Sequence, residues 1–149
     1  MTDFNQQFML RALQLGEQVR NKTGDNPWVG CVIVNDGLVL GEGYTHAYGG
    51  PHAEADAIQH AETQGHSLDG STLYCTLEPC SFHGRTPSCA KTIVEKNISH
   101  VVLAIRDPHP QVNGEGIRIL KAGGIRVTEG IEELAVRRSL DTWLKVYNE

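Results

Sequence analysis

The sequence has no long apolar run and no excess of basic residues, and these absences exclude several classes of protein. Its longest uninterrupted apolar stretch is about five residues, far below the roughly 20 that a membrane-spanning helix requires. Lys and Arg number 13 against 18 for Asp and Glu, so the net charge of −5 gives no general attraction to nucleic acid. The N-terminus lacks the basic head and apolar stretch of a secretory signal. We therefore expect a cytoplasmic protein that binds neither membranes nor nucleic acid.

The chain also lacks internal repeats, low-complexity tracts and linkers rich in Pro or Ser. Its 149 residues suit one domain, so we expect a single domain over 1–149. Apolar residues make up 40% and charged residues 21%, which excludes a mostly disordered chain. There are only 4 cysteines, and in a cytoplasmic protein these are expected to be reduced thiols or metal ligands rather than disulfides.

Hydrophobic periodicity predicts alternating strands and helices along the chain. A hairpin followed by strand–helix units predicts an α/β fold: a three-layer α/β/α sandwich around a mixed five-stranded sheet, in which the strand–helix–strand units are parallel. Helices are expected over residues 3–21, 52–64, 88–96, 114–122 and 131–147, and strands over 29–34, 38–44, 72–77, 100–105 and 125–130.

Three short segments carry residues suited to metal chemistry: His52-Ala53-Glu54, Glu78-Pro79-Cys80 and the later Cys89. One imidazole and two thiolates suit a single Zn²⁺ and leave a fourth tetrahedral position for water, whose pKa the metal would lower to about 7. His52 and Cys89 fall at expected helix starts, where the helix dipole favours thiolate over thiol. Glu54 can reach that water without binding the metal, and we expect it to carry the proton to a leaving amine.

Two other interpretations of these residues stay open at this point. The first is a closed structural zinc site, which would need a fourth protein ligand. Neither remaining cysteine has matching spacing, and we expect both Cys31 and Cys75 to lie in the core. The second is a chain without any metal. The pattern H-x-E followed by P-C and a later C favours the zinc-dependent nucleobase deaminases, although eight residues separate Cys80 from Cys89 where two are usual.

At a finer level the sequence resembles the deaminase domain of the bifunctional riboflavin-biosynthesis deaminase/reductase, over about residues 5–140. The resemblance rests on four segments: NPWVGCVIV (26–34), GGPHAEADAI (49–58), TLYCTLEPCSFHGRTPSC (72–89) and IRDPHP (105–110). The GRTP insert between the cysteines separates this family from cytidine, guanine and tRNA-adenosine deaminases. The resemblance implies a cytidine-deaminase-like fold and a zinc-dependent aminohydrolase acting on a cyclic amidine. Its substrate would be 2,5-diamino-6-(5-phosphoribosylamino)pyrimidin-4(3H)-one, converted to the 5-aminouracil ribotide and ammonia.

The resemblance also implies roles for particular residues. Glu54 would be the catalytic proton carrier. Asn26 would hydrogen-bond the pyrimidine, Arg85 would pair with the phosphate, and Asp107 would contact the ribose side. Taken singly, each of these three is more typical of an ordinary loop residue. The zinc ligands would be His52, Cys80 and Cys89, and further substrate contacts are expected from His83 and His109.

Several positions depart from the family pattern, and all of them surround the expected ribose-phosphate end. Thr45 and Phe82 stand where the family commonly has His, His109 replaces an Asn, and the stretch around Asn113 also differs. One explanation is a related substrate, such as a pyrimidine or purine base or nucleoside. The other is that His46 and His83 supply the missing contacts from adjacent positions.

The family usually adds an NADPH-dependent reductase domain after the deaminase domain. This sequence ends at Glu149 without a dinucleotide-binding fingerprint, so we expect no reductase activity. We expect either a stand-alone deaminase or an excised domain. A separate reductase is a possible partner. The resemblance further implies a homo-oligomer, a dimer or tetramer. Trp143 and Tyr147 could contribute an interface or simply pack on the sheet. A non-catalytic zinc-containing binding module is the remaining alternative, and Glu54 speaks against it because a structural site does not need that carboxylate.

Overall fold

The computed structural model describes residues 4–24, 26–46, 51–80, 88–108 and 113–148. Strands and helices alternate as the sequence pattern predicts, and the strands at 72–77 and 100–105 have the predicted bounds. In chain order the elements are α1 (Phe4–Glu17), β1 (Gly30–Asn35), β2 (Leu38–Tyr44), α2 (Ala53–Thr63), β3 (Thr72–Leu77), α3 (Cys89–Glu95), β4 (His100–Ile105), α4 (Glu115–Ala122), β5 (Arg126–Thr128), α5 (Glu133–Ser139) and α6 (Asp141–Asn148).

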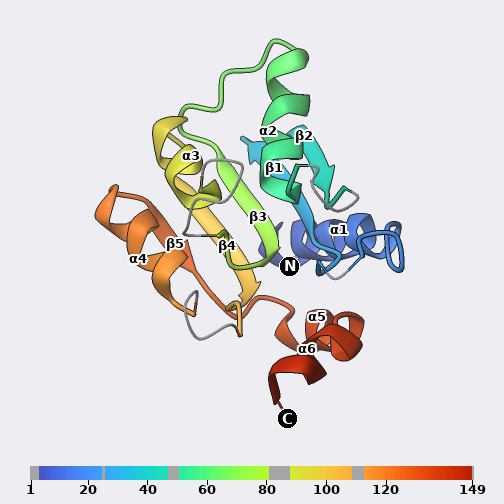
Figure 1. Ribbon diagram of the computed structural model, residues 1–149. Helices are drawn as coiled ribbons and strands as arrows, with labels where there is room; N and C mark the ends of the chain where they lie inside the picture. The colour runs from blue at the N-terminus through green and yellow to red at the C-terminus, as the bar shows by residue number, and fades with distance from the viewer. Residues whose placement is uncertain (1–3, 25, 47–50, 81–87, 109–112, 149) are drawn as a thin grey trace.

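The strands form one mixed five-stranded sheet in the order β2-β1-β3-β4-β5 (Figure 1). Strand β1 runs antiparallel to both β2 and β3, whereas the central strand β3 and its neighbours β4 and β5 run parallel to one another. β1, β3 and β4 are buried along almost their whole length, as expected for strands covered on both faces. The predicted α/β class and mixed sheet are confirmed.

Helices cover both faces of this sheet. α1 packs on β1 and β3 and contacts α5, while α2 packs on β1 and β2 and α3 contacts α4. Successive residues of β2 show the two faces: the Glu42 side chain reaches α1, whereas its neighbours Gly41 and Gly43 face α2. The result is the predicted three-layer sandwich, with a continuous apolar core between the layers.

The register of the strands brings four chain segments to one edge of the sheet. Gly30 at the start of β1 pairs with Tyr44 at the end of β2, and the ends of β3 and β4 pair through Leu77 and Ile105. Because β1 is antiparallel to β3, the start of β1 lies at the same edge as the ends of β2, β3 and β4. The segment that precedes β1 and the segments that follow β2, β3 and β4 therefore converge there, as ligand-binding loops do in open α/β sheets.

Two glycines allow α2 to lie directly against the backbone of β2. A Cβ atom on Gly43 would lie 2.4 Å from both the Ala53 carbonyl oxygen and the Ala57 nitrogen. A Cβ on Gly41 would lie 2.5 Å from the Ala57 carbonyl oxygen. A side chain of any size at these positions would push the helix away. Gly41 and Gly43, which lie on the same face of β2, therefore allow the short distance between α2 and the sheet.

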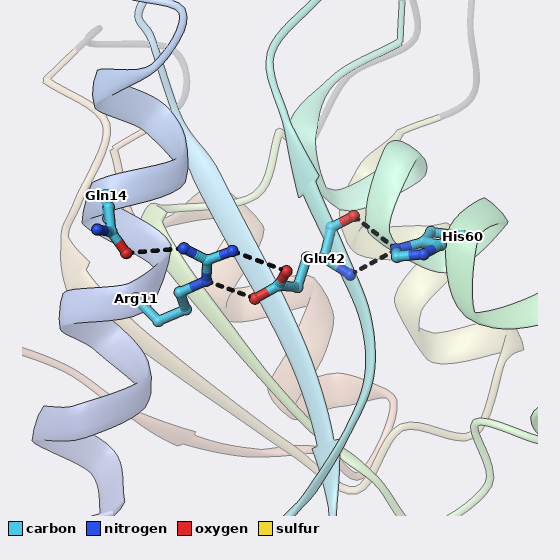
Figure 2. Close-up of polar contacts among 4 residues, drawn as sticks. All are labelled: Arg11, Gln14, Glu42 and His60. Carbon is cyan, nitrogen blue, oxygen red and sulfur yellow. Dashed lines mark hydrogen bonds and ion pairs between the residues drawn. The ribbon is translucent and has the colours of Figure 1, made fainter.

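A polar bridge ties β2 to helices on both faces (Figure 2). Arg11 of α1 donates two hydrogen bonds to the Glu42 carboxylate, at 2.6 and 3.0 Å, and a third to Gln14 Oε1 at 2.7 Å. The backbone N–H of Glu42 donates to Nδ1 of His60 in α2, at 3.0 Å. The Arg11 guanidinium lowers the pKa of Glu42 below its usual value.

The predicted final helix over 131–147 is wrong in one respect, because it is two helices that meet at Leu140. The Ser139 carbonyl oxygen there accepts the indole N–H of Trp28 at 3.2 Å, a long-range bond that local periodicity cannot reveal. Val136, Leu140 and Leu144 are buried in the core, where α5 packs on β4 and α6 packs on α5. The first helix ends at Glu17, four residues before its predicted end.

None of the helices in the described ranges has the length and apolar character needed to cross a membrane.

We predict that Gly43→Ala destabilises the protein by at least about 2 kcal/mol, because the new methyl group meets backbone atoms that cannot move independently. Urea unfolding of the two proteins measures the difference. Leu38→Ala is the control, since Leu38 lies on the same strand but is 60% exposed, and we expect a change of less than about 0.5 kcal/mol. Equal stability of Gly43→Ala and wild type would contradict the close packing of α2.

We predict that Arg11→Gln lowers stability by about 0.5–1 kcal/mol at pH 7 and by less near pH 3. Arg11 lowers the folded-state pKa of Glu42 below the ordinary 4.5, so the stabilisation is fully present above pH 4.5 and is lost as pH falls through the lower folded value. Unfolding of metal-free protein at both pH values tests this. Arg137→Gln, which removes an exposed pair with Glu133, is the control. A difference that persists unchanged at pH 3 would contradict the assignment.

Candidate active site and metal centre

His52 stands at the N-terminal cap of α2, directly above the edge of the sheet where the loops converge. Its backbone is extended, and its carbonyl oxygen accepts the first helical hydrogen bond from the Asp56 nitrogen at 3.0 Å. This backbone geometry directs the ring toward two sulfurs. Nδ1 lies 3.7 Å from Sγ of Cys80 and 3.5 Å from Sγ of Cys89.

The two cysteines are held together by backbone hydrogen bonds between their segments. The Cys80 carbonyl oxygen, just after β3, accepts the Ala90 N–H at 3.0 Å and the Ser88 hydroxyl at 2.9 Å. Ser88 also caps α3, because its Oγ accepts the Lys91 N–H. The Cys89 N–H donates to Sγ of Cys80 at 3.2 Å. The start of α3 is thereby fixed against the end of β3, which places both sulfurs on one side of His52.

The ligand atoms of His52, Cys80 and Cys89 lie within 4.8 Å of one another and could hold a metal ion. One imidazole nitrogen and two thiolate sulfurs are the donor set that zinc prefers, so the residues fit this metal. Within the described ranges, no fourth His, Cys, Asp or Glu joins the cluster. Cys31 and Cys75 are fully buried on neighbouring strands, as predicted for core residues. A site with three protein ligands keeps a coordination position open.

The electrostatics of the cluster favour a thiolate. Hydrogen bonds from Cys89 and from His52 lower the pKa of Cys80 to about 4. The bond to Cys80 raises the pKa of His52 to about 9. The Cys89 thiol has a raised pKa because it donates to Cys80 and is buried. In the metal-free protein the negative charge therefore resides on Cys80, facing a protonated imidazole, and a bound cation would take the place of those protons.

Glu54 lies in the first turn of α2 and is only 5% exposed. Its pKa is raised, chiefly by burial and next by the negative charge on Cys80. The Cys75 thiol donates a hydrogen bond to its Oε1 at 3.5 Å. Sequence reasoning assigned Cys75 to the core and missed this contact, because only the strand register shows that its side chain points under α2. A buried carboxyl group with a raised pKa, beside a candidate metal centre, is suited to hold and release a proton.

Other residues expected at the site fall at the same edge of the sheet. Asn26 precedes β1 and is half-buried, and its carbonyl oxygen accepts the Thr23 hydroxyl at 2.6 Å. Asp107 follows β4 and is also half-buried. Asn113 is exposed shortly before α4. The remaining predicted residues lie outside the described ones: His83, Arg85 and His109, together with Phe82.

Thr45 and His46 have different surroundings. Thr45 is buried, and its hydroxyl accepts the Val29 N–H at 3.0 Å, so it links β1 to the end of β2. The His46 ring stacks on Tyr44 with centroids 5.4 Å apart, and its Nε2 lies 3.0 Å from Oδ1 of Asp56. Thr45, which departs from the family pattern, therefore has a structural role. The His46 side chain contacts α2 through Asp56.

Sequence reasoning missed the part played by Glu78, which it treated only as a neighbour of Cys80. Glu78 is 3% exposed and accepts backbone N–H groups from the segment between β4 and α4. A carboxylate directly after a buried strand was the available signal, since such a group requires partners.

Comparison with known proteins assigns the chain to a family. Residues 2–105 match the family described as the cytidine and deoxycytidylate deaminase zinc-binding region. The match covers most of the chain, and the chain belongs to this family. The fold and the clustered His, Cys and Cys thus define a zinc-binding deaminase domain.

More particularly, the chain is similar to the riboflavin biosynthesis protein RibD. It is 45% identical to the Chlamydia pneumoniae protein over 148 residues, covering 97% of this chain and 38% of that protein. The Acinetobacter baumannii RibD structure superposes with a TM-score of 0.90 at 42% identity, covering 96% of this chain and 40% of the other. The Thermotoga maritima diaminohydroxyphosphoribosylaminopyrimidine deaminase/5-amino-6-(5-phosphoribosylamino)uracil reductase gives a TM-score of 0.87 at 39% identity, covering 97% and 41%.

The predicted family resemblance and the cytidine-deaminase-like fold are therefore confirmed. The chain spans about two fifths of the length of these relatives, 38% to 41%.

Proposed function

We propose that the protein is a zinc-dependent deaminase of 2,5-diamino-6-(5-phosphoribosylamino)pyrimidin-4(3H)-one. Water replaces the 2-amino group, and the products are 5-amino-6-(5-phosphoribosylamino)uracil and ammonia. The observation that carries the proposal is the convergence of two sulfurs and an imidazole beside a buried carboxyl group. The deaminase and reductase names of the Thermotoga maritima relative support this substrate.

His52, Cys80 and Cys89 would hold one zinc ion per chain. Zinc in an open site lowers the pKa of a coordinated water and so supplies a nucleophile near neutral pH. The protein's own part is to keep the ligands in place: the N-terminal end of α2 presents His52, and the bonds between Cys80 and the start of α3 hold the two sulfurs together.

Glu54 would move the proton. Its burial raises its pKa, so the carboxyl group can hold a proton at Oε1 or Oε2 and later donate it to the departing ammonia. The Cys75 thiol bonded to Oε1 restricts the orientation of the carboxyl group. This requirement for a proton carrier favours an enzyme over a binding module.

Substrate recognition is assigned by the resemblance and by position at the sheet edge. Asn26 would hydrogen-bond the pyrimidine, and Asp107 would contact the ribose side. Arg85 would pair with the phosphate, with His83 and His109 beside it. The net charge of −5 gives no general attraction to nucleic acid and so favours a small-molecule ligand.

Partners follow from the relatives. The Thermotoga maritima protein carries a reductase activity in the same chain, and we propose that a reductase acts on the product of this deaminase, whether on the same polypeptide or on another. We also propose a homo-oligomer in the cytoplasm, a dimer or tetramer, which sedimentation would measure.

The test is ammonia release from the phosphoribosylated diaminopyrimidinone by zinc-loaded protein. We predict turnover by wild type and a loss of at least about 100-fold in Glu54→Gln, with zinc content unchanged, because the amide cannot carry the proton. Cys89→Ser, the matched variant on the metal side, should lose both zinc and activity. Elemental analysis measures the zinc.

Each outcome decides a different part of the proposal. Near-normal turnover in Glu54→Gln would contradict the role of Glu54. Full zinc in Cys89→Ser would contradict its place as a ligand. A zinc-loaded, folded wild type that releases ammonia only from dephosphorylated bases or nucleosides would replace the substrate with that alternative.

A further inference from the structure

Glu78 connects the end of β3 to two other parts of the fold. Its backbone N–H donates to the Ile105 carbonyl oxygen at 3.0 Å and so extends the pairing between β3 and β4. Its side chain is buried and turns toward the start of α4. A carboxyl group in such a place must find hydrogen-bond donors, because burying it without partners is costly.

The donors are backbone N–H groups at both ends of the connection between β4 and α4. Oε1 accepts from Asp107 at 3.1 Å and from Gly114 at 3.0 Å. Oε2 accepts from Ile117, in the first turn of α4, at 3.2 Å. One carboxylate thus fixes where this connection leaves the sheet and where it enters the helix.

Close packing reinforces the same arrangement. A Cβ on Gly116 would lie 2.1 Å from the Pro79 carbonyl oxygen and 3.2 Å from Oε2 of Glu78. The first turn of α4 therefore rests on the backbone immediately after Glu78, and only glycine allows this approach. Two residues after Glu78 the chain reaches Cys80. The Glu78 side chain therefore relates the position of the Asp107 backbone to that of the Cys80 backbone.

We infer that Glu78 is a positioning residue that sets the distance between the Asp107 segment and the metal ligand Cys80, and so governs substrate affinity. The inference rests on the proposed function in assigning Asp107 to the substrate side. Glu78 is not among the residues whose atoms could hold the metal, and the inference gives it no contact with the reacting atoms. Its removal should therefore change the binding of the ribotide more than the chemical step.

Glu78→Gln is the direct test. The amide retains one acceptor oxygen but places an NH₂ group against the Ile117 N–H or the Asp107 and Gly114 N–H groups, so two donors face each other. We predict a KM for the ribotide raised about tenfold, kcat within about threefold of wild type, and unchanged zinc content. Amide hydrogen exchange of the peptide covering residues 106–118 should be faster.

Glu115→Gln is the matched control, because it makes the same chemical change in the first turn of α4 at an exposed carboxylate paired with Arg118. It should leave KM and exchange unchanged. Gly116→Ala is a second, independent variant, since it displaces the same turn from Pro79, and it should reproduce the raised KM. Its control is Gly123→Ala, which crowds the Val94 side chain at the far end of α4.

Unchanged KM and unchanged exchange in Glu78→Gln would overturn the inference. So would a fall in kcat at constant KM, or a loss of zinc that matches the loss of activity, because either would make Glu78 part of the chemistry or of the metal site. If zinc-loaded wild type does not deaminate the ribotide, the proposed function fails instead. Exchange in the 106–118 peptide and zinc content then still decide whether Glu78 positions this segment.

Discussion

The contact between α2 and the backbone of β2 is the constraint on which the site depends. Gly41 and Gly43 let the helix lie against the strand at a distance that no larger residue allows. Because His52 is the N-cap of α2, this packing fixes the imidazole at the edge of the sheet. The same packing turns Glu54, one residue into the helix, down toward the sheet and the Cys75 thiol. The arrangement of the candidate metal ligand and the carboxyl group therefore depends on two residues without side chains.

Two buried carboxyl groups beside the metal centre have different partners, and the difference separates their proposed parts. Burial raises the pKa of both groups, so only their partners distinguish them. Glu54 has a sulfur donor and lies in the same helix turn as His52, which suits a group that gains and loses a proton. Glu78 has several backbone N–H donors from one segment, among them Asp107, Gly114 and Ile117, which suits a group that stays in place and holds that segment. Both groups are buried, but we assign proton transfer to Glu54 and the positioning of a backbone segment to Glu78.

Much of the fold could be predicted because local patterns agree with it. The runs at 72–77 and 100–105 are apolar and β-branched, and they form strands with those bounds. The convergence of His52, Cys80 and Cys89 could be predicted from their positions after strand ends and at helix starts. The break at Leu140 could not, because it coincides with a bond from Trp28 to Ser139, 111 residues away in the chain.

Contacts that depend on strand register or on the close approach of distant segments also could not be predicted from the sequence. The strand register, in which Cys31 of β1 lies opposite Cys75 of β3, places the Cys75 thiol within hydrogen-bond distance of Glu54. The partners of Glu78 lie on the next strand connection, 29 to 39 residues further along the chain.

Zinc K-edge X-ray absorption of the zinc-loaded protein tests the central claim most directly. The account predicts one zinc per chain with two sulfurs near about 2.3 Å, one imidazole nitrogen near about 2.0–2.1 Å and one further light atom in an exchangeable position. That result would show an open site formed by His52, Cys80 and Cys89. A shell of three or four sulfurs, or a second imidazole, would mean a closed structural site and would contradict the account.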